Sequence, residues 1–319
     1  MVDIDNNKKF NMKLFPIYKM FAWDLLFYYA ISFLFLTNVK GLSAAEVVLV
    51  DVSFYTFFKF LFQLPGTIIV DKFGKRTSLI MANIFICIAI FLILLTFNIT
   101  TLILAEIFLA LGYVIKSLVE SNLLYDSIPK SDYRRRLFGN LDGKGSSLYY
   151  YLNALSSVTA GFLYIINPYL PIIICLIISV IAAYLSTLFH DIHVKNINKF
   201  EKIPNPTQRI KEYFKELKYI FRYIFKSNRL RCLIIFYGLL QSLISLTATL
   251  DKSLLQDLSI QPEYFGIIYG LVALLSGIAS YSQNIFHNIF RNKVLTIFAA
   301  LFVLSCITSR FIYYDKCSF

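Results

Sequence analysis

Long apolar segments alternate with short polar segments along most of the chain. Two clear examples, 78–97 and 171–189, are each about 20 residues long and contain no charged residue. A helix of that length crosses the hydrocarbon core of a bilayer. Together with charge and turn signals, the pattern predicts nine transmembrane helices. Their expected ranges are 21–37, 47–70, 78–97, 101–125, 146–166, 169–189, 232–250, 264–285 and 294–312.

The composition favours the same fold class. Of the 319 residues, 58% are hydrophobic and only 16% are charged, and the mean hydropathy is +0.65. Soluble domains carry about 25% charged residues. The composition therefore excludes a soluble enzyme and a disordered chain. It predicts an all-α polytopic membrane protein that has the lipid bilayer as its surroundings.

The net charge of +12 has a topological explanation. Of the 31 lysines and arginines, 25 fall before the first predicted helix or in every second connection, and only 4 lie on the other side. Basic residues mark the cytoplasmic side of membrane proteins. The distribution predicts a multi-pass integral membrane protein with a cytoplasmic N-terminus. It also removes the reason to expect a nucleic-acid partner.

A long basic segment divides the chain into three parts. We expect a six-helix N-terminal bundle at 1–190, a cytoplasmic loop at 191–231, and a partial C-terminal bundle at 232–319. Within the loop, apolar residues recur at helical spacing over 210–225, opposite lysines and arginines. This amphipathic helix could lie on the inner membrane interface or pack against the cytoplasmic loops.

Two loop motifs point to a family. The turn after the second predicted helix reads Asp71-Lys72-Phe73-Gly74-Lys75-Arg76. Glycine supplies the positive φ that a tight turn can need, and the basic pair holds the turn inside. A second motif after the fourth helix contains Tyr125-Asp126-Ser127-Ile128-Pro129, followed by the basic run 134–136.

With these motifs the chain resembles the major facilitator superfamily, whose signature between helices 2 and 3 is similar to the hexapeptide. The resemblance covers about 15–312 in organisation. It departs from the family at Thr67, where a glycine is usual, and it lacks the glycine-proline motif of helix 5 that is common in proton-drug antiporters.

The resemblance implies a secondary transporter of the cell membrane that moves a small molecule by alternating access. It also implies a cytoplasmic gate. The gate residues expected from it are Asp71, Gly74, Lys75, Arg76, Asp126, Arg134 and Arg135.

The fourth predicted helix carries the main candidates for transport. Glu106, Tyr113 and Glu120 fall on one helical stripe, and Lys116 lies at its edge. Ionisable residues within a membrane are costly, so each is a candidate contact for substrate or coupling ion. In the resembled family, helices 1 and 4 line the central cavity. The alternative is an internal ion pair between Lys116 and Glu120 that only fixes helix packing.

Two further candidates lie on other helices. Asp24 is placed near the inner end of the first predicted helix, where an interfacial anchor competes with a role in substrate binding. Lys59 is deeper in the second helix and could pair with a carboxylate elsewhere. A proton is a candidate coupling ion, because a carboxylate in a dry cavity can exchange protons near neutral pH.

Other functions lack support in the sequence. The five cysteines are scattered and form no CxxC pair, and no serine or cysteine sits in a nucleophile motif. We therefore expect no metal, no cofactor and no enzyme activity. A channel, an interaction protein and a truncated membrane protein that does not transport stay as alternatives.

The length is short for the resembled family. Twelve helices with their loops need roughly 400 residues, and the pattern here accounts for nine. The sequence thus predicts a transporter that lacks the last three helices.

Overall fold

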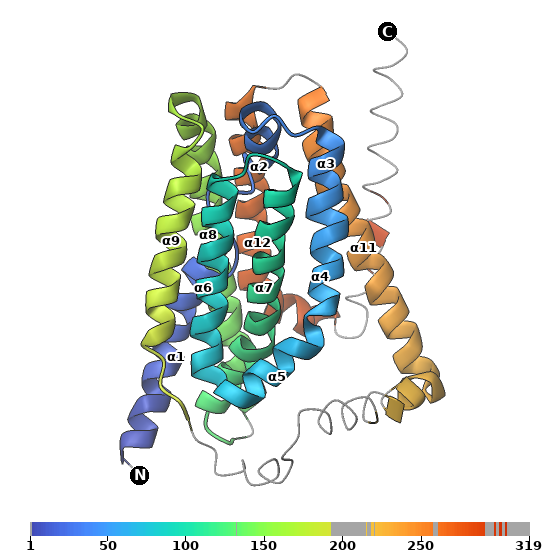
Figure 1. Ribbon diagram of the computed structural model, residues 1–319. Helices are drawn as coiled ribbons and strands as arrows, with labels where there is room; N and C mark the ends of the chain where they lie inside the picture. The colour runs from blue at the N-terminus through green and yellow to red at the C-terminus, as the bar shows by residue number, and fades with distance from the viewer. Residues whose placement is uncertain are drawn as a thin grey trace. The chain divides into compact units, whose positions relative to one another are not determined.

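The computed structural model describes residues 2–131, 133–192, 221–257 and 261–290, with a few isolated positions elsewhere. Every regular element in these ranges is a helix (Figure 1). The long helices are α1 (Val2–Ala22), α6 (Lys75–Leu94), α7 (Ile99–Ser127), α8 (Arg134–Ile166), α9 (Leu170–Thr187), α11 (Asn228–Asp257) and α12 (Pro262–Phe290). The shorter ones are α2 (Ser32–Leu34), α3 (Ala44–Val48), α4 (Tyr55–Leu61), α5 (Gln63–Phe73) and the π-helical segments η1 (Phe35–Val39) and η2 (Leu49–Phe54). The predicted all-α fold class is confirmed.

Local sequence signals explain where several helices begin. Asn98 caps α7 by accepting a hydrogen bond from the backbone of Thr101, and Ser43 caps α3 through a reciprocal pair of bonds with Glu46. Such capping boxes satisfy backbone N–H groups that have no partner within the helix. Gly74 separates α5 from α6 with φ of 81°, a conformation that favours glycine.

The second predicted helix is interrupted and bent at Phe62. Ala44–Leu61 and Gln63–Phe73 meet at an angle of 48°. Pro65 lies just after the bend, and its ring collides with the carbonyl four residues earlier, that of Leu61. The proline therefore accounts for the bend.

The first predicted helix differs from the expectation of one span over 21–37. In the structure α1 begins near the N-terminus and ends at Ala22, and a non-helical segment 23–31 follows before α2. Within this segment Phe27 has a positive φ of 64°. Broken helices are tolerated within a bilayer where protein surrounds the freed backbone groups.

Four helices are long and apolar enough to cross a membrane within the described residues, or five if the bent pair counts as one span. The four are α6, α7, α9 and Tyr264–Ser282 of α12. Of the other predictions, the span 294–312 and most of the amphipathic helix 210–225 lie outside the described residues.

The chain divides into two compact units. Met1–Ile192 and Asp251–Ile285 form the first, and the intervening and terminal segments belong to the second. In the first unit, α6 and α7 run side by side (Figure 1) and α6 also packs on α9, while α1 packs on α8. The proposed division at residues 190 and 231 stays a prediction.

The first unit contains two separate apolar clusters. One includes Phe35, Ile90 and Leu102, and the other includes Leu79 and Val119. On α7 the first cluster ends at Leu109 and the second begins at Ile115. The boundary between them, near the middle of α7, is where the polar residues gather.

Candidate functional site

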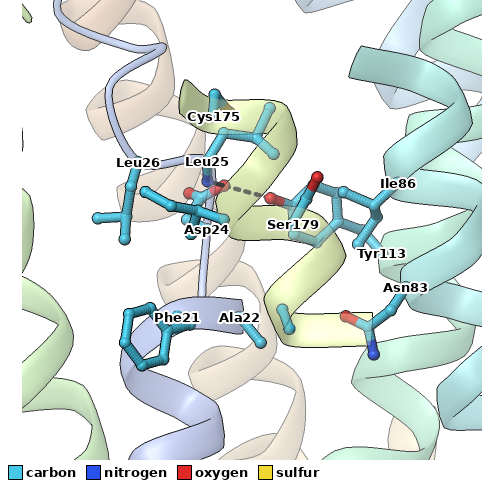
Figure 2. Close-up of a pocket in the computed structure, with 12 residues that line it drawn as sticks. Phe21, Ala22, Asp24, Leu25, Leu26, Asn83, Ile86, Tyr113, Cys175 and Ser179 are labelled. Carbon is cyan, nitrogen blue, oxygen red and sulfur yellow. Dashed lines mark hydrogen bonds between the residues drawn. The ribbon is translucent and has the colours of Figure 1, made fainter. Parts of the chain in front are cut away.

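The break after α1 places an acidic side chain at the boundary of the two clusters. Asp24 Oδ1 accepts a hydrogen bond from the backbone N–H of Leu25 at 3.0 Å, which gives this N–H a partner outside a helix. It also accepts bonds from the hydroxyls of Tyr29 at 2.8 Å and Tyr113 at 2.5 Å. Figure 2 shows the carboxylate directed towards Tyr113. Asp24 thus lies level with Tyr113 near the middle of α7. It does not lie near the inner end of a continuous helix 21–37, as the sequence suggested.

Lys116, on α7, contacts the backbone at the same break in helix 1. Its Nζ donates to the carbonyl oxygen of Trp23 at 3.4 Å and lies 5.4 Å from the centre of the Tyr113 ring. The side chain is 3% exposed. A carbonyl freed at the C-terminal end of a helix carries partial negative charge, so a lysine stabilises it. Lys116 and Tyr113 together connect α7 to the interrupted helix.

Glu120 and Glu106 complete the stripe on α7. Glu120 interacts electrostatically with Lys116, and its Oε1 is buried without a hydrogen-bond partner among the described residues. Within the described chain these two side chains form no ion pair within 4.0 Å. Glu106 is also buried, at 4% exposure. The structure therefore brings Asp24, Tyr113, Lys116 and Glu120 into one region.

Lys59 lies apart from this region. It is exposed on α4, and its Nζ is 5.4 Å from the centre of the Tyr55 ring. Tyr55 itself interacts electrostatically with Asp24 and Glu106. The expected pairing of Lys59 with a carboxylate is not seen among the described ion pairs.

An ion pair that the sequence does not reveal extends the site towards the start of α8. Lys19 Nζ lies 2.5 Å from Asp142 Oδ1, and the lysine side chain is 2% exposed. The same Nζ is 3.9 Å from the centre of the Trp23 ring. In the sequence Lys19 is one of the basic residues before the first predicted helix, and Asp142 lies before the predicted start of a helix at 146. Because α8 begins at Arg134, Asp142 enters the bundle.

The charged groups alternate along the interior. Glu120 interacts electrostatically with Lys116 and Lys19, and Lys116 also interacts with Asp24. With the Lys19–Asp142 pair, these contacts connect the middle of the bundle to the start of α8. We call Asp24, Lys116, Glu120, Lys19 and Asp142 the charge series.

A small cavity lies beside Asp24 (Figure 2). It is lined by the end of α1 and by Asn83 of α6, Tyr113 of α7 and Ser179 of α9. Its other walls are mainly apolar. The cavity shows that the helices do not close completely around the carboxylate.

The residues of the two loop motifs form a second group. Lys75 pairs with Asp126, which joins the start of α6 to the end of α7. Arg76 donates to the carbonyl oxygen of Thr187 at 2.7 Å, and its backbone N–H donates to Asp191 at 3.2 Å. These bonds satisfy groups at the C-terminal end of α9 and the N-terminal end of α6.

The remaining gate candidates have different environments. Arg134 donates to the carbonyl of Tyr125 and lies 3.8 Å from the centre of its ring. Asp71 and Arg135 are exposed. The structure thus brings Lys75 and Asp126 into direct contact and places Arg76 against the end of α9, and it leaves the role of the whole set as a prediction.

Apolar spans around a buried polar centre are typical of an integral membrane protein. The sequence matches the Major Facilitator Superfamily over residues 18–314, and the chain belongs to this family. The predicted family is confirmed. No curated protein matched the sequence significantly.

A solved structure supports the fold independently. The crystal structure of a mutant of the nucleoside transporter NupG is similar, with a TM-score of 0.56 and 14% sequence identity. The match covers 89% of this chain and 67% of that chain. At this identity the likeness is evidence for the fold. Family and fold together support a secondary transporter with a small-molecule substrate, and they point away from an enzyme.

Proposed function

We propose that the chain moves a small solute across the membrane by alternating access, with a proton as the coupling ion. The observation that carries this proposal is the charge series beside the broken first helix. Transporters commonly place substrate and coupling-ion sites where membrane helices are interrupted. Three carboxylates and two ammonium groups interact there, and Lys19, Lys116 and the Oε1 atom of Glu120 among them are buried.

Glu120 is the residue best suited to carry the proton. Lys19 and Tyr18 face it from α1, Lys116 from α7 and Asp142 from α8. The unpartnered Oε1 can take up a proton without losing a hydrogen bond. Protonation would weaken its attraction to both lysines, so proton binding and helix packing are coupled in this scheme.

The cytoplasmic contacts supply the gate in this proposal. Lys75–Asp126 and the bonds of Arg76 hold α6, α7 and α9 together at one end of the bundle. Gly74 allows the tight turn on which both basic residues depend. Opening the cytoplasmic side would require a change at these contacts.

Transport in liposomes tests the function. We expect the purified chain to catalyse counterflow of a labelled solute, and uptake to respond to an imposed pH gradient. Nucleosides are a reasonable first set of solutes, because a nucleoside transporter shares the fold. Flux without saturation or counterflow would favour a channel instead.

The proton role is tested by Glu120→Gln. We expect the response to the pH gradient to fall about tenfold or more, because the amide cannot exchange the proton. Glu46→Gln, which changes a half-buried carboxylate at the start of α3, serves as the matched control and should keep the full response. An unchanged pH response in Glu120→Gln would remove this residue from the mechanism.

A further inference from the structure

The cavity beside Asp24 lies in a polar layer between the two apolar clusters of the first unit. Three helices pass from one cluster to the other there, and each carries a polar side chain at the change: Asn83 on α6, Tyr113 on α7 and Ser179 on α9. These side chains and Asp24 all line the cavity (Figure 2). We use the name polar layer for these four residues. Polar groups inside a membrane span are costly, so such a convergence is typical of a functional site.

The carboxylate of Asp24 has one occupied oxygen and one open oxygen. Among the described residues its hydrogen bonds all go to Oδ1, from the backbone N–H of Leu25 and from the hydroxyls of Tyr29 and Tyr113. An ionised carboxylate accepts at both of its oxygens. Oδ2 therefore keeps its capacity for a ligand.

The buried lysines of this region do not fill that position. Lys19 pairs with Asp142, and Lys116 donates to the carbonyl oxygen of Trp23. Neither lysine is among the described residues that line the cavity. In the described part of the chain no ion pair within 4.0 Å joins either of them to Asp24. A further positive charge can therefore contact this carboxylate from the cavity.

The neutral side chains of the polar layer offer lone pairs to a ligand. The Tyr113 hydroxyl donates to Asp24, and the Ser179 hydroxyl donates to a carbonyl oxygen of its own helix at 2.8 Å. The amide of Asn83 donates to the hydroxyl of Tyr18 and to a carbonyl of its own helix, which uses both hydrogens. Each of these groups still has an oxygen that can accept. Acceptors alone match a cation, whereas the oxygen of a water molecule also needs donors.

The broken first helix adds backbone oxygens. Phe21 and Ala22, in the last turn of α1, line the cavity. The last carbonyl groups of a helix have no partner within it and carry partial negative charge. Interrupted membrane helices use such C-terminal ends to coordinate sodium ions.

The size and charge of the cavity select the ion. Its volume is about 10 Å³, which is just enough for one water-sized particle. A sodium ion is smaller than a water molecule, and a potassium ion is not. The polar layer contains one carboxylate, whose charge a monovalent cation balances. The described chain has no cluster of three or more His, Cys, Asp or Glu side chains of the kind that holds a divalent metal.

We infer that this cavity binds one sodium ion between the polar layer and the end of α1. The inference goes beyond the proposed transport function, because an ion can bind here whether or not a solute is moved. It is also separate from the proton proposed for Glu120, which is not among the described residues that line the cavity. A bound ion would hold α1, α6, α7 and α9 together at the polar layer.

Sodium binding can be measured on the purified full chain. Trp23 is the single tryptophan of the sequence and adjoins Asp24, so its fluorescence reports on the site. NaCl is titrated into protein in choline chloride at constant ionic strength. We expect a saturable change in fluorescence and a rise in the unfolding temperature. KCl should bind at least about tenfold more weakly, because the larger ion does not fit the cavity.

Variants locate the ion. Asp24→Asn should weaken sodium binding about tenfold or more, because it removes the carboxylate charge from the site. Ser179→Ala removes one oxygen ligand and should weaken binding about three- to tenfold. Ser186→Ala is the matched control and should keep the full affinity. Its hydroxyl also donates to a carbonyl one turn earlier on α9, but it lies outside the cavity lining.

Three results would overturn the sodium site. Equal responses to NaCl and KCl would show an effect of salt alone, with only water in the cavity. Sodium binding that is unchanged in both Asp24→Asn and Ser179→Ala would place the ion elsewhere. If Asp24→Asn does not fold, the serine variants decide, and equal sodium affinity in Ser179→Ala and Ser186→Ala would count against the site.

The outcomes also separate this inference from the proposed function. Saturable counterflow of a solute by a chain that does not bind sodium would overturn the sodium site and leave transport standing. Sodium binding that needs Asp24, without counterflow of any solute, would support the site and count against transport.

Discussion

Lys19 shows how a single residue can change character between sequence and structure. In the sequence it is one of several lysines before an apolar run, which is typical of a cytoplasmic label. In the structure it is buried, paired with Asp142 and stacked on Trp23. Its partner lies 123 residues away. No local pattern could have revealed this pair.

The polar residues of α7 differ from Lys19, because the sequence already identifies them as candidates. Ionisable residues within an apolar run are rare, so the sequence alone identifies Glu106, Lys116 and Glu120 as candidates. What it could not provide is their partners. Tyr113 binds Asp24, and Lys116 binds the carbonyl of Trp23 instead of forming a direct ion pair with Glu120.

Removing the Asp142 charge should destabilise the protein. Asp142→Asn leaves the buried Lys19 ammonium without its carboxylate, and Asp142 is about one-third exposed, so we expect a loss of about 1–3 kcal/mol. Thermal unfolding in detergent measures the effect. Asp5→Asn, an exposed carboxylate on the same α1 helix as Lys19, is the control.

A double variant tests whether the loss comes from the unpaired charge. Lys19→Met combined with Asp142→Asn removes both charges and should recover part of the lost stability, as a double-mutant cycle would show. Equal destabilisation in the single and double variants would contradict this explanation.

At the scale of the element, close packing depends on small residues that face a partner helix. Gly112 on α7 faces α6, where an added Cβ would lie 2.8 Å from Ile86 Cγ1 and 2.9 Å from the carbonyl oxygen of Ala82. Backbone atoms cannot move aside as a flexible side chain can. The glycine therefore allows α6 and α7 to approach closely.

Gly112→Ala should accordingly cost about 1–3 kcal/mol through overpacking. Gly238→Ala on α11 is a matched control, because nothing lies within 4 Å of its added Cβ. It should be neutral or stabilise by about 0.5–1 kcal/mol, since alanine favours a helix over glycine. The unfolding temperatures of the two variants should therefore shift in opposite directions, or Gly112→Ala should show the clearly larger decrease. Equal shifts would show that the α6–α7 contact is looser than described.

The elements also differ in how well the sequence predicted them. The sequence predicts the spans of α6, α7 and α9 to within a few residues, because each is a long and mainly apolar segment bounded by polar turns. The prediction for helix 1 was wrong, since the apolar run 21–37 contains a break at 23–31. Hydropathy reports burial in lipid and does not report where the backbone stops being helical.

For the whole molecule, the distribution of basic residues predicts which loops face the cytoplasm. Ser131, between α7 and α8, should face inside, and Ser43, before α3, should face outside. Ser131→Cys and Ser43→Cys, each in a background whose native cysteines are replaced, should be labelled by an impermeant thiol reagent from opposite sides of intact vesicles. Ser186→Cys, at a buried position, is the unlabelled control. Labelling of both loop positions from one side would contradict the predicted topology.

The sequence by itself determined the fold class, the family and the motif turn at 71–76. These follow from properties that are linear along the chain: the length of apolar runs matched to a bilayer, the distribution of basic residues, and a short turn with a glycine at positive φ. Only the tertiary structure decided where helix 1 breaks, that Asp24 lies level with the middle of α7, and that Lys19 and Asp142 belong to the polar centre. The physical reason is that a buried charge is stabilised by partners from other helices, and those partners meet only when the bundle is assembled.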